Sequence, residues 1–117
     1  MIRLVVGAAL VVLCAGTASA EQRLPKYNYP TAARADFVIG CLAGSDFKRE
    51  LLDRCSCAID TIADMMSYDG YDQAATILSM QQGGLGARTS MFRDTPIAKQ
   101  RTEELRRAQA EASLRCQ

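Results

Sequence analysis

The sequence has 117 residues, with 14 basic and 13 acidic side chains, a formal net charge of +1 and no histidine. This near-neutral charge gives no reason to expect binding to nucleic acid or to an anionic surface. The absence of histidine removes the commonest general base, the serine–histidine and cysteine–histidine nucleophile pairs and most zinc sites. We therefore expect no enzymatic activity, with no catalytic residue, metal ligand or cofactor.

Residues 1–20 have the pattern of a secretory signal peptide. A short basic start at Arg3 precedes an apolar run from Leu4 to Ala15, and Ala18-Ser19-Ala20 supplies small residues for cleavage before Glu21. The apolar run is short for a membrane span, which needs about 20 residues. An uncleaved anchor helix is the alternative. We expect a periplasmic or secreted protein without stable membrane insertion once the signal peptide is removed.

The remainder is predicted to form an extended N-terminal arm and a single helical domain. Residues 21–30 carry prolines and tyrosines without helical periodicity, which is typical of an extended segment. Tyr27 and Tyr29 would either pack across the helices or contact a partner. Residues 31–117 are of ordinary length for one domain.

A first helix is predicted to begin at Thr31, acting as its cap, and to end at Gly44 in the left-handed conformation. On this helix Ala33, Phe37 and Cys41 share one face. The short turn that follows predicts that the first two helices are antiparallel neighbours.

Residues 47–66 show the clearest helical periodicity. Apolar side chains recur every three or four positions, and neighbouring residues widen the face that they form. The residues on this face are Phe47, Leu51, Leu52, Cys55, Ala58, Ile59, Ile62, Met65 and Met66. Ser45 or Asp46 would cap this helix; the alternative is a later start capped by Asp53. Cys57 lies about 200° around the helix from Cys55, so the two sulfurs face different neighbours.

Two further helices are predicted, separated by a glycine-rich loop at residues 82–86. The third runs roughly from Tyr71 to Gln82, after a break at residues 67–70. Met91 and Phe92 are expected to reach the core from a connector. The fourth begins at Thr95-Pro96, a cap followed by proline, and runs to about Arg115.

The fourth helix should present one face to the core and one to solvent. The core-facing residues are predicted to be Ile97, Leu105, Ala108, Ala112 and Cys116. Glu103–Arg107 and Glu111–Arg115 are spaced for ion pairs on an exposed face. The fold class is therefore all-α, a small four-helix bundle stapled by disulfides.

Four cysteines follow the signal peptide: Cys41, Cys55, Cys57 and Cys116. An even number in a short exported chain indicates two disulfides, with three possible pairings. Cys41–Cys55 with Cys57–Cys116 is one example. Binding of Cu(I) by cysteine and methionine sulfurs is an alternative, but the diverging sulfurs of a helical Cys-x-Cys do not chelate one ion. Thiol–disulfide exchange is a further alternative, for which Cys-x-x-Cys is the usual motif.

Asp60 and Asp64 lie one helical turn apart and could share a proton or bind a cation. We favour a solvent-facing acidic surface instead. Residues 36–72 carry eight acidic and three basic side chains, whereas residues 88–115 carry seven basic and four acidic ones. The two regions either attract each other within the fold or are solvated separately, and an acidic surface for a cationic partner is the alternative. Asp60 and Asp64, with Tyr27 and Tyr29, form the predicted partner surface.

The pattern Phe37…Cys41…Cys55-Ser56-Cys57…Tyr68…Tyr71 resembles small secreted bacterial Cys-x-Cys helical proteins of unknown function, over residues 37–78. The resemblance implies a helical periplasmic fold and no catalytic residues. We predict a non-catalytic periplasmic or secreted interaction or accessory protein, stabilised by two disulfides, whose partner is another periplasmic protein. A periplasmic copper-handling protein and a thiol–disulfide exchange protein are the alternatives.

Overall fold

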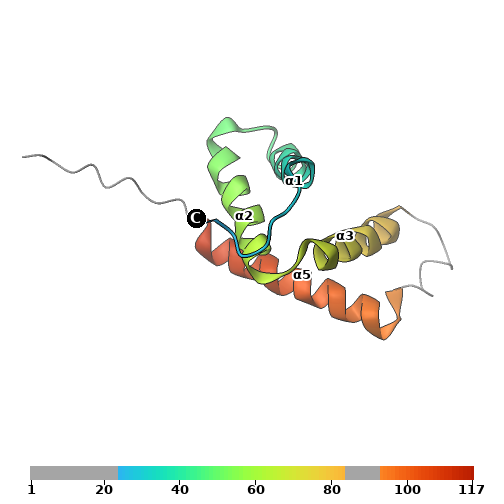
Figure 1. Ribbon diagram of the computed structural model, residues 1–117. Coiled ribbons are helices and arrows are strands. Elements are labelled where there is room, and N and C mark those ends of the chain that lie inside the picture. Colours follow the sequence, from blue (N-terminus) through green and yellow to red (C-terminus); the bar gives the residue numbers. More distant parts are fainter. Residues whose placement is uncertain (1–23, 84–92) are drawn as a thin grey trace, which may run out of the picture.

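The computed structural model describes residues 24–83 and 93–117, and these ranges contain helices and no strand. The α-helices are α1 (Thr31–Ala43), α2 (Leu52–Met65), α3 (Tyr68–Gln82) and α5 (Pro96–Arg115), with a 3-10 turn, η1, at Arg49–Leu51 (Figure 1). The predicted all-α, disulfide-stapled helical bundle is confirmed. The predicted signal peptide, most of the glycine-rich loop, Met91 and Phe92 lie outside the described residues.

Helix α5 is the longest element and forms the base on which α2 and α3 pack (Figure 1). Helix α3 lies along the first half of α5, where the Arg101 guanidinium donates to the Gln73 amide oxygen at 3.1 Å. Helix α2 meets the other end of α5. Helix α1 packs chiefly against α2. Helix α2 is thus the element that joins α1 to the rest of the fold.

The contacts between α1 and α2 follow the predicted antiparallel order. Cys41, late in α1, is bonded to Cys55, early in α2, and Arg34, early in α1, pairs with Asp60, late in α2. Figure 1 shows α1 nearly end-on, so the two axes also cross. This crossing leaves space on both sides of the line along which the helices touch.

Helix α2 begins later than the periodicity of residues 47–66 predicts. After α1 the chain turns through Asp46 and Phe47, whose φ angles are 54° and 53°, a left-handed conformation that cannot continue a right-handed helix. Phe47 is 63% exposed, so its predicted place in the core is wrong. Leu51 occupies the N-cap position without a side-chain hydrogen bond, and none of the predicted caps is used. The start at Leu52 lies nearest the alternative that begins at Asp53.

The ends of α1 also differ from the prediction. Thr31 is the first helical residue and Pro30 takes the cap position, without a side-chain hydrogen bond. Gly44 has φ −65° and ψ −9°, which is right-handed, so the predicted left-handed ending lies later in the turn.

Helices α3 and α5 each begin after a residue whose side chain caps the first turn. The Ser67 hydroxyl accepts the N–H of Gly70 at 3.2 Å and so caps α3. Helix α3 therefore begins at Tyr68, within the predicted break at residues 67–70 and before the predicted start at Tyr71. The Thr95 hydroxyl accepts the N–H of Ala98 at 3.3 Å, with Pro96 next in sequence. This start is confirmed.

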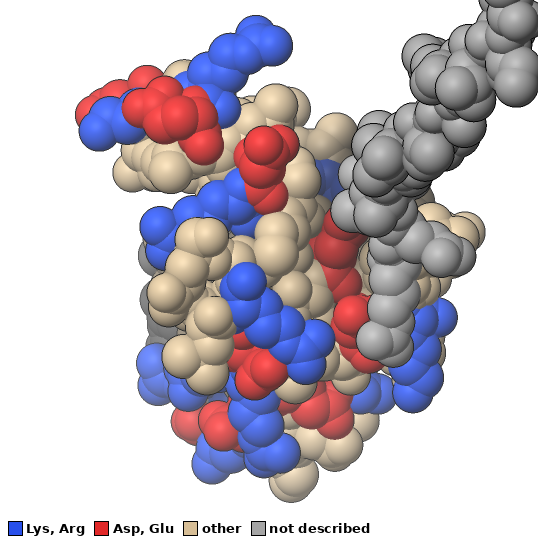
Figure 2. Space-filling model, turned by 90° about the vertical axis from the view of Figure 1, so that its left-hand side faces the viewer, with Lys and Arg blue, Asp and Glu red and all other residues tan. Residues whose placement is uncertain are grey.

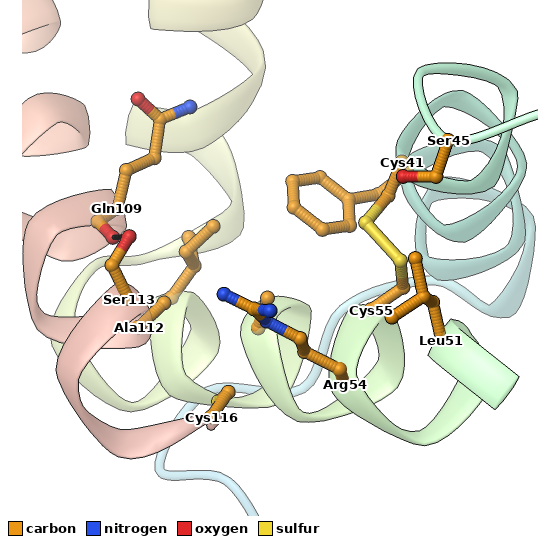
Figure 3. Close-up of a pocket in the computed structure, with 12 residues that line it drawn as sticks. Cys41, Ser45, Leu51, Arg54, Cys55, Gln109, Ala112, Ser113 and Cys116 are labelled. Atoms are coloured by element: carbon orange, nitrogen blue, oxygen red, sulfur yellow. Dashed lines mark hydrogen bonds between the residues drawn. A yellow bond between two sulfur atoms is a disulfide. The ribbon is translucent and has the colours of Figure 1, made fainter.

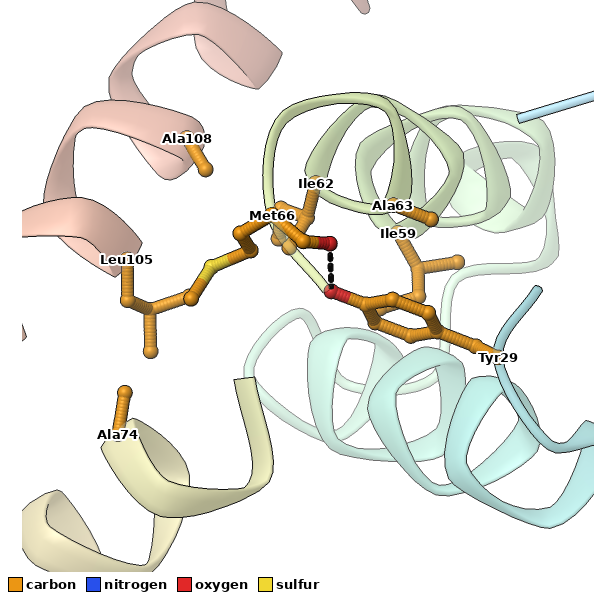
Figure 4. Close-up of a cluster of buried hydrophobic side chains, with 8 residues drawn as sticks. All are labelled: Tyr29, Ile59, Ile62, Ala63, Met66, Ala74, Leu105 and Ala108. Atoms are coloured by element: carbon orange, nitrogen blue, oxygen red, sulfur yellow. Dashed lines mark hydrogen bonds between the residues drawn. The ribbon is translucent and has the colours of Figure 1, made fainter. Parts of the chain in front are cut away.

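The core forms where α2, α3, α5 and the N-terminal arm meet (Figure 4). Its buried residues are Tyr29, Ile59, Ile62, Ala63, Met66, Ala74, Leu105 and Ala108. Alanines on α3 and α5 let the helices approach closely, and Met66 reaches across to Leu105 (Figure 4). Ile97, Leu52 and Met65 are 59%, 38% and 44% exposed, so their predicted burial is wrong. Leu105, Ala108, Ala112 and Cys116 are buried as predicted.

Two disulfides fix α2 to its neighbours. Cys41–Cys55 joins α1 to α2 with a sequence separation of 14, and Cys57–Cys116 joins α2 to the end of α5 with a separation of 59. Of the three pairings that the four cysteines allow, this is the one that the sequence analysis named as an example. Each thiol of the Cys-x-Cys motif therefore holds a different helix.

We predict that the longer-range disulfide contributes more to stability. On the chain-entropy model, removing Cys57–Cys116 by a double Cys→Ser substitution should lower the free energy of unfolding by about 4 kcal/mol, and removing Cys41–Cys55 by about 3 kcal/mol. Urea unfolding of the oxidised variants measures both values. A larger loss in the Cys41→Ser, Cys55→Ser variant would contradict the prediction.

Candidate functional site

The N-terminal arm is held against α2, which decides the role of its two tyrosines. The backbone N–H of Tyr27 donates to the carbonyl of Ala63 at 3.0 Å. Tyr29 is only 2% exposed, and its hydroxyl donates to the Met66 carbonyl at 3.0 Å (Figure 4). Tyr29 is therefore a core residue and is not available to a partner, which corrects that part of the predicted surface. Tyr27 is half-buried.

Tyr29 belongs to a cluster of three aromatic rings. Its ring centroid lies 5.4 Å from that of Tyr68 and 5.2 Å from that of Tyr71, distances typical of favourable aromatic pairs. Burial, followed by the proximity of Tyr71, raises the pKa of Tyr29 well above its ordinary value, while Arg34 opposes the shift. Burial and then the nearby carboxylate of Asp36 raise the pKa of Tyr71. The cluster joins the arm to α3.

The two predicted acidic residues do not act together. Asp60 is exposed and pairs with the guanidinium of Arg34 at 2.9 Å. Asp64 accepts the backbone N–H of Lys26 at 2.8 Å and lies 4.0 Å from the guanidinium of Arg115. Because each carboxylate has its own positively polarised partner, the arrangement differs from a proton-sharing pair. Asp64 instead helps to hold the arm and α5 against α2.

Charges of both signs are interleaved on one face of the molecule. On the face in Figure 2, basic and acidic side chains alternate without a large patch of one sign. The pairs Glu103–Arg107 and Glu111–Arg115 form along α5 at 3.6 and 2.7 Å, as predicted. Both of these pairs lie within the basic region of the sequence, and the ion pair of Asp64 with Arg115, at 4.0 Å, joins the acidic region to it.

The cysteines of the described residues supply no free thiolate to bind a metal ion. All four of those after residue 23 are in disulfides, and no group of three or more histidine, cysteine, aspartate or glutamate side chains in residues 24–83 and 93–117 is placed to hold a metal ion. A disulfide sulfur is not the thiolate that binds Cu(I).

A groove runs along one side of the contact between α1 and α2, with a volume of about 550 Å³. We call it the α1–α2 groove. Apolar residues of both helices contribute to its walls. The lining residues are Thr31, Arg34, Ala35, Val38, Ile39 and Leu42 of α1, and Leu52, Ser56, Ile59 and Asp60 of α2. Ile39 and Leu52 are 57% and 38% exposed, so apolar surface here faces solvent.

The two ends of the α1–α2 groove differ in character. The Arg34–Asp60 ion pair lies at one end. At the other end Leu42 leads into the left-handed turn, where its carbonyl accepts the N–H of Phe47 at 2.8 Å. A bulky residue in the left-handed region is a strained conformation of the kind that clusters at functional sites. The Phe47 side chain is 63% exposed beside this turn.

The sequence did not identify this groove. Ile39 lies off the face shared by Ala33, Phe37 and Cys41, and Leu52 was placed in the core. The available signal was Ile39 itself, a large apolar residue outside the buried face of its helix.

No protein-family model matches the chain, and searches of curated proteins and of solved structures found no match. Within residues 24–83 and 93–117, none of the helices has the length and apolar character needed to cross a membrane.

We predict that the tyrosine cluster makes the fold sensitive to alkaline pH. Folding raises the pKa of Tyr29 above its unfolded value of 10.0. Its protonated hydroxyl therefore contributes fully to the free energy of unfolding below pH 10.0, and this contribution is lost as the pH rises toward the folded pKa. The free energy of unfolding should therefore fall above about pH 10. Tyrosinate absorbance should develop at higher pH in the folded than in the urea-unfolded protein.

The control for this prediction is Tyr29→Phe, which keeps the ring and removes the ionisable hydroxyl. It should lose about 1 kcal/mol at neutral pH, the typical net value of one hydrogen bond, and show a smaller alkaline decline. If the free energy of unfolding of Tyr29→Phe fell at alkaline pH as much as that of the unaltered protein, groups other than Tyr29 would cause the decline.

Proposed function

We propose that this protein is a non-catalytic periplasmic or secreted interaction protein, whose α1–α2 groove receives an apolar segment of another exported protein. The observation that carries the proposal is the solvent-facing apolar lining of this groove, including Ile39 and Leu52. Exposed apolar surface beside polar groups is a common mark of protein interaction sites. The groove between two helices has the form used to bind an amphipathic helix.

The occupant is expected to be an amphipathic segment with its apolar side inward. The lining offers aliphatic side chains along its length and the Arg34–Asp60 pair at one end. A helix that places apolar residues on one face would contact Val38, Ile39 and Leu52 and keep its polar face in water. Specificity would come from the charged end of the groove.

The chemistry of the remaining residues supports a binding role over the two alternatives. Copper binding by cysteine needs free thiolates, and the cysteines of the described residues are held in disulfides. Each disulfide joins two different helices, whereas an exchange protein usually carries its pair in a Cys-x-x-Cys motif. Periplasmic or secreted localisation is favoured because disulfides persist in oxidising compartments. The resemblance to small secreted Cys-x-Cys proteins remains a prediction and agrees with this proposal.

We predict that a photo-crosslinking amino acid at Ile39 captures a defined partner in the native host. The matched control is the same substitution at Ile97, because the two isoleucines are 57% and 59% exposed and Ile97 does not line the groove. Mass spectrometry of the adducts should identify one protein captured from Ile39 and not from Ile97. Equal capture from both positions would count against the groove.

A charge in the groove should then disrupt the same contact. With the crosslinker at Leu52, Ile39→Asp should reduce the yield of the adduct strongly, because a carboxylate in an apolar contact must lose its hydration. Ile97→Asp should leave the yield unchanged. Circular dichroism of both variants shows whether the helices remain folded.

A further inference from the structure

A second hollow lies between α1, α2 and α5, with a volume of about 420 Å³ (Figure 3). We call it the three-helix pocket. It is separate from the α1–α2 groove, because the two sets of lining residues have no member in common. Adjacent residues at the start of α2 and just before it line different hollows: Leu51 and Cys55 line the pocket, and Leu52 and Ser56 line the groove.

The lining of the three-helix pocket is apolar at its base and polar at its edge. Phe37, Leu51, Ala58, Ile62 and Ala112 supply apolar surface. Ser45, Gln109 and Ser113 add neutral polar groups. This size and composition fall within the range of small-molecule sites, which are about 300–1,000 Å³ and mostly apolar, with few polar groups.

Arg54 is the one charged residue among those that line the pocket. Figure 3 shows its guanidinium lying over the hollow, between Cys55 and Ala112. It makes no ion pair with any carboxylate of the described residues, whereas Arg34, Arg101 and Arg115 all do. The pocket therefore carries a single uncompensated positive charge beside an apolar surface.

The disulfides give this pocket a fixed shape. Cys41–Cys55 forms part of its wall and ties α1 to α2, while Cys116 lines its other side and ties α5 to α2 through Cys57. Because the three helices around the pocket are covalently joined, they need little ordering when a ligand binds. A preorganised site of this kind loses less binding free energy to conformational entropy.

We propose that the three-helix pocket binds a small monocarboxylate with an apolar body. The carboxylate would pair with the guanidinium of Arg54, whose planar fork of N–H donors matches two carboxylate oxygens. The apolar body would lie against Phe37, Ile62 and Ala112. One positive charge that makes no ion pair with the described residues complements a singly charged anion, and the apolar base disfavours a ligand that is polar throughout.

The test is isothermal titration of the oxidised protein with decanoate, a carboxylate on an apolar chain. Decylamine, with the same chain and the opposite charge, is the ligand control. Decanoate should bind with one site per chain, and decylamine should not bind. Absence of decanoate binding, or equal binding of both compounds, would overturn the proposal.

Two variants separate the charge from the hollow. Arg54→Met keeps most of the apolar stem and should weaken decanoate binding by about tenfold or more, since hydrogen bonds to charged groups are among the stronger ones. Arg106→Met is the matched control, because Arg106 is also exposed and without an ion pair in the described chain but does not line the pocket. Unchanged binding by Arg54→Met would overturn the assignment of the carboxylate site.

Ser113→Trp tests the hollow independently of charge. Ser113 is exposed at the pocket edge, so a larger side chain can be accommodated without disturbing the core and should obstruct the base. Decanoate binding should be lost in this variant. Full affinity would place the ligand elsewhere. Crosslinking from Ile39 should be unaffected in this variant. The proposal for the three-helix pocket can therefore fail without the proposal that the α1–α2 groove binds a partner, and the two outcomes are distinguishable.

Discussion

The divergence of Cys55 and Cys57 on α2 is the constraint on which the other features depend. Two residues apart on a helix, their sulfurs face different neighbours, and each forms a disulfide with one of them. Helix α2 is thereby fixed to α1 on one side and to α5 on another. The Cys41–Cys55 bond joins the two helices that border both the α1–α2 groove and the three-helix pocket, and the Cys57–Cys116 bond holds the α5 wall of the pocket. A small domain with a limited core gains both stability and shape from this arrangement.

The N-terminal arm completes the fold at the opposite end of α2. The Tyr29 hydroxyl donates to the Met66 carbonyl where α2 ends, and its ring packs against those of Tyr68 and Tyr71 at the start of α3. Asp64 holds the backbone of Lys26. A carbonyl left without an intrahelical partner at a helix end is thus satisfied by a side chain from a distant segment. The arm acts as a structural element of the core, although it contains no helix of its own.

The sequence predicted what depends on local chemistry and on helical periodicity. The start of α5 followed from Thr95-Pro96, and the divergence of Cys55 and Cys57 followed from 3.6 residues per turn. The start of α2 was misplaced because Phe47 has helical spacing relative to Leu51, while the backbone at Asp46 and Phe47 is left-handed. Neither hollow could be predicted, because each depends on side chains that two or three packed helices leave uncovered. Arg54 in particular carries no sequence signal that separates it from the other arginines.

The connectivity of the disulfides also has a consequence for the order of oxidation. Cys41 has two candidate partners, Cys55 and Cys57, at nearly the same distance along the chain, whereas Cys116 is remote from all three. Loop closure therefore favours early bonding of Cys41 with little discrimination between the two. A bond from Cys41 to Cys57 would block the native partner of Cys116 and would have to be exchanged through a thiolate intermediate. Where that bond forms, disulfide isomerisation, on a timescale of seconds to hours, would be slower than the formation of the helices.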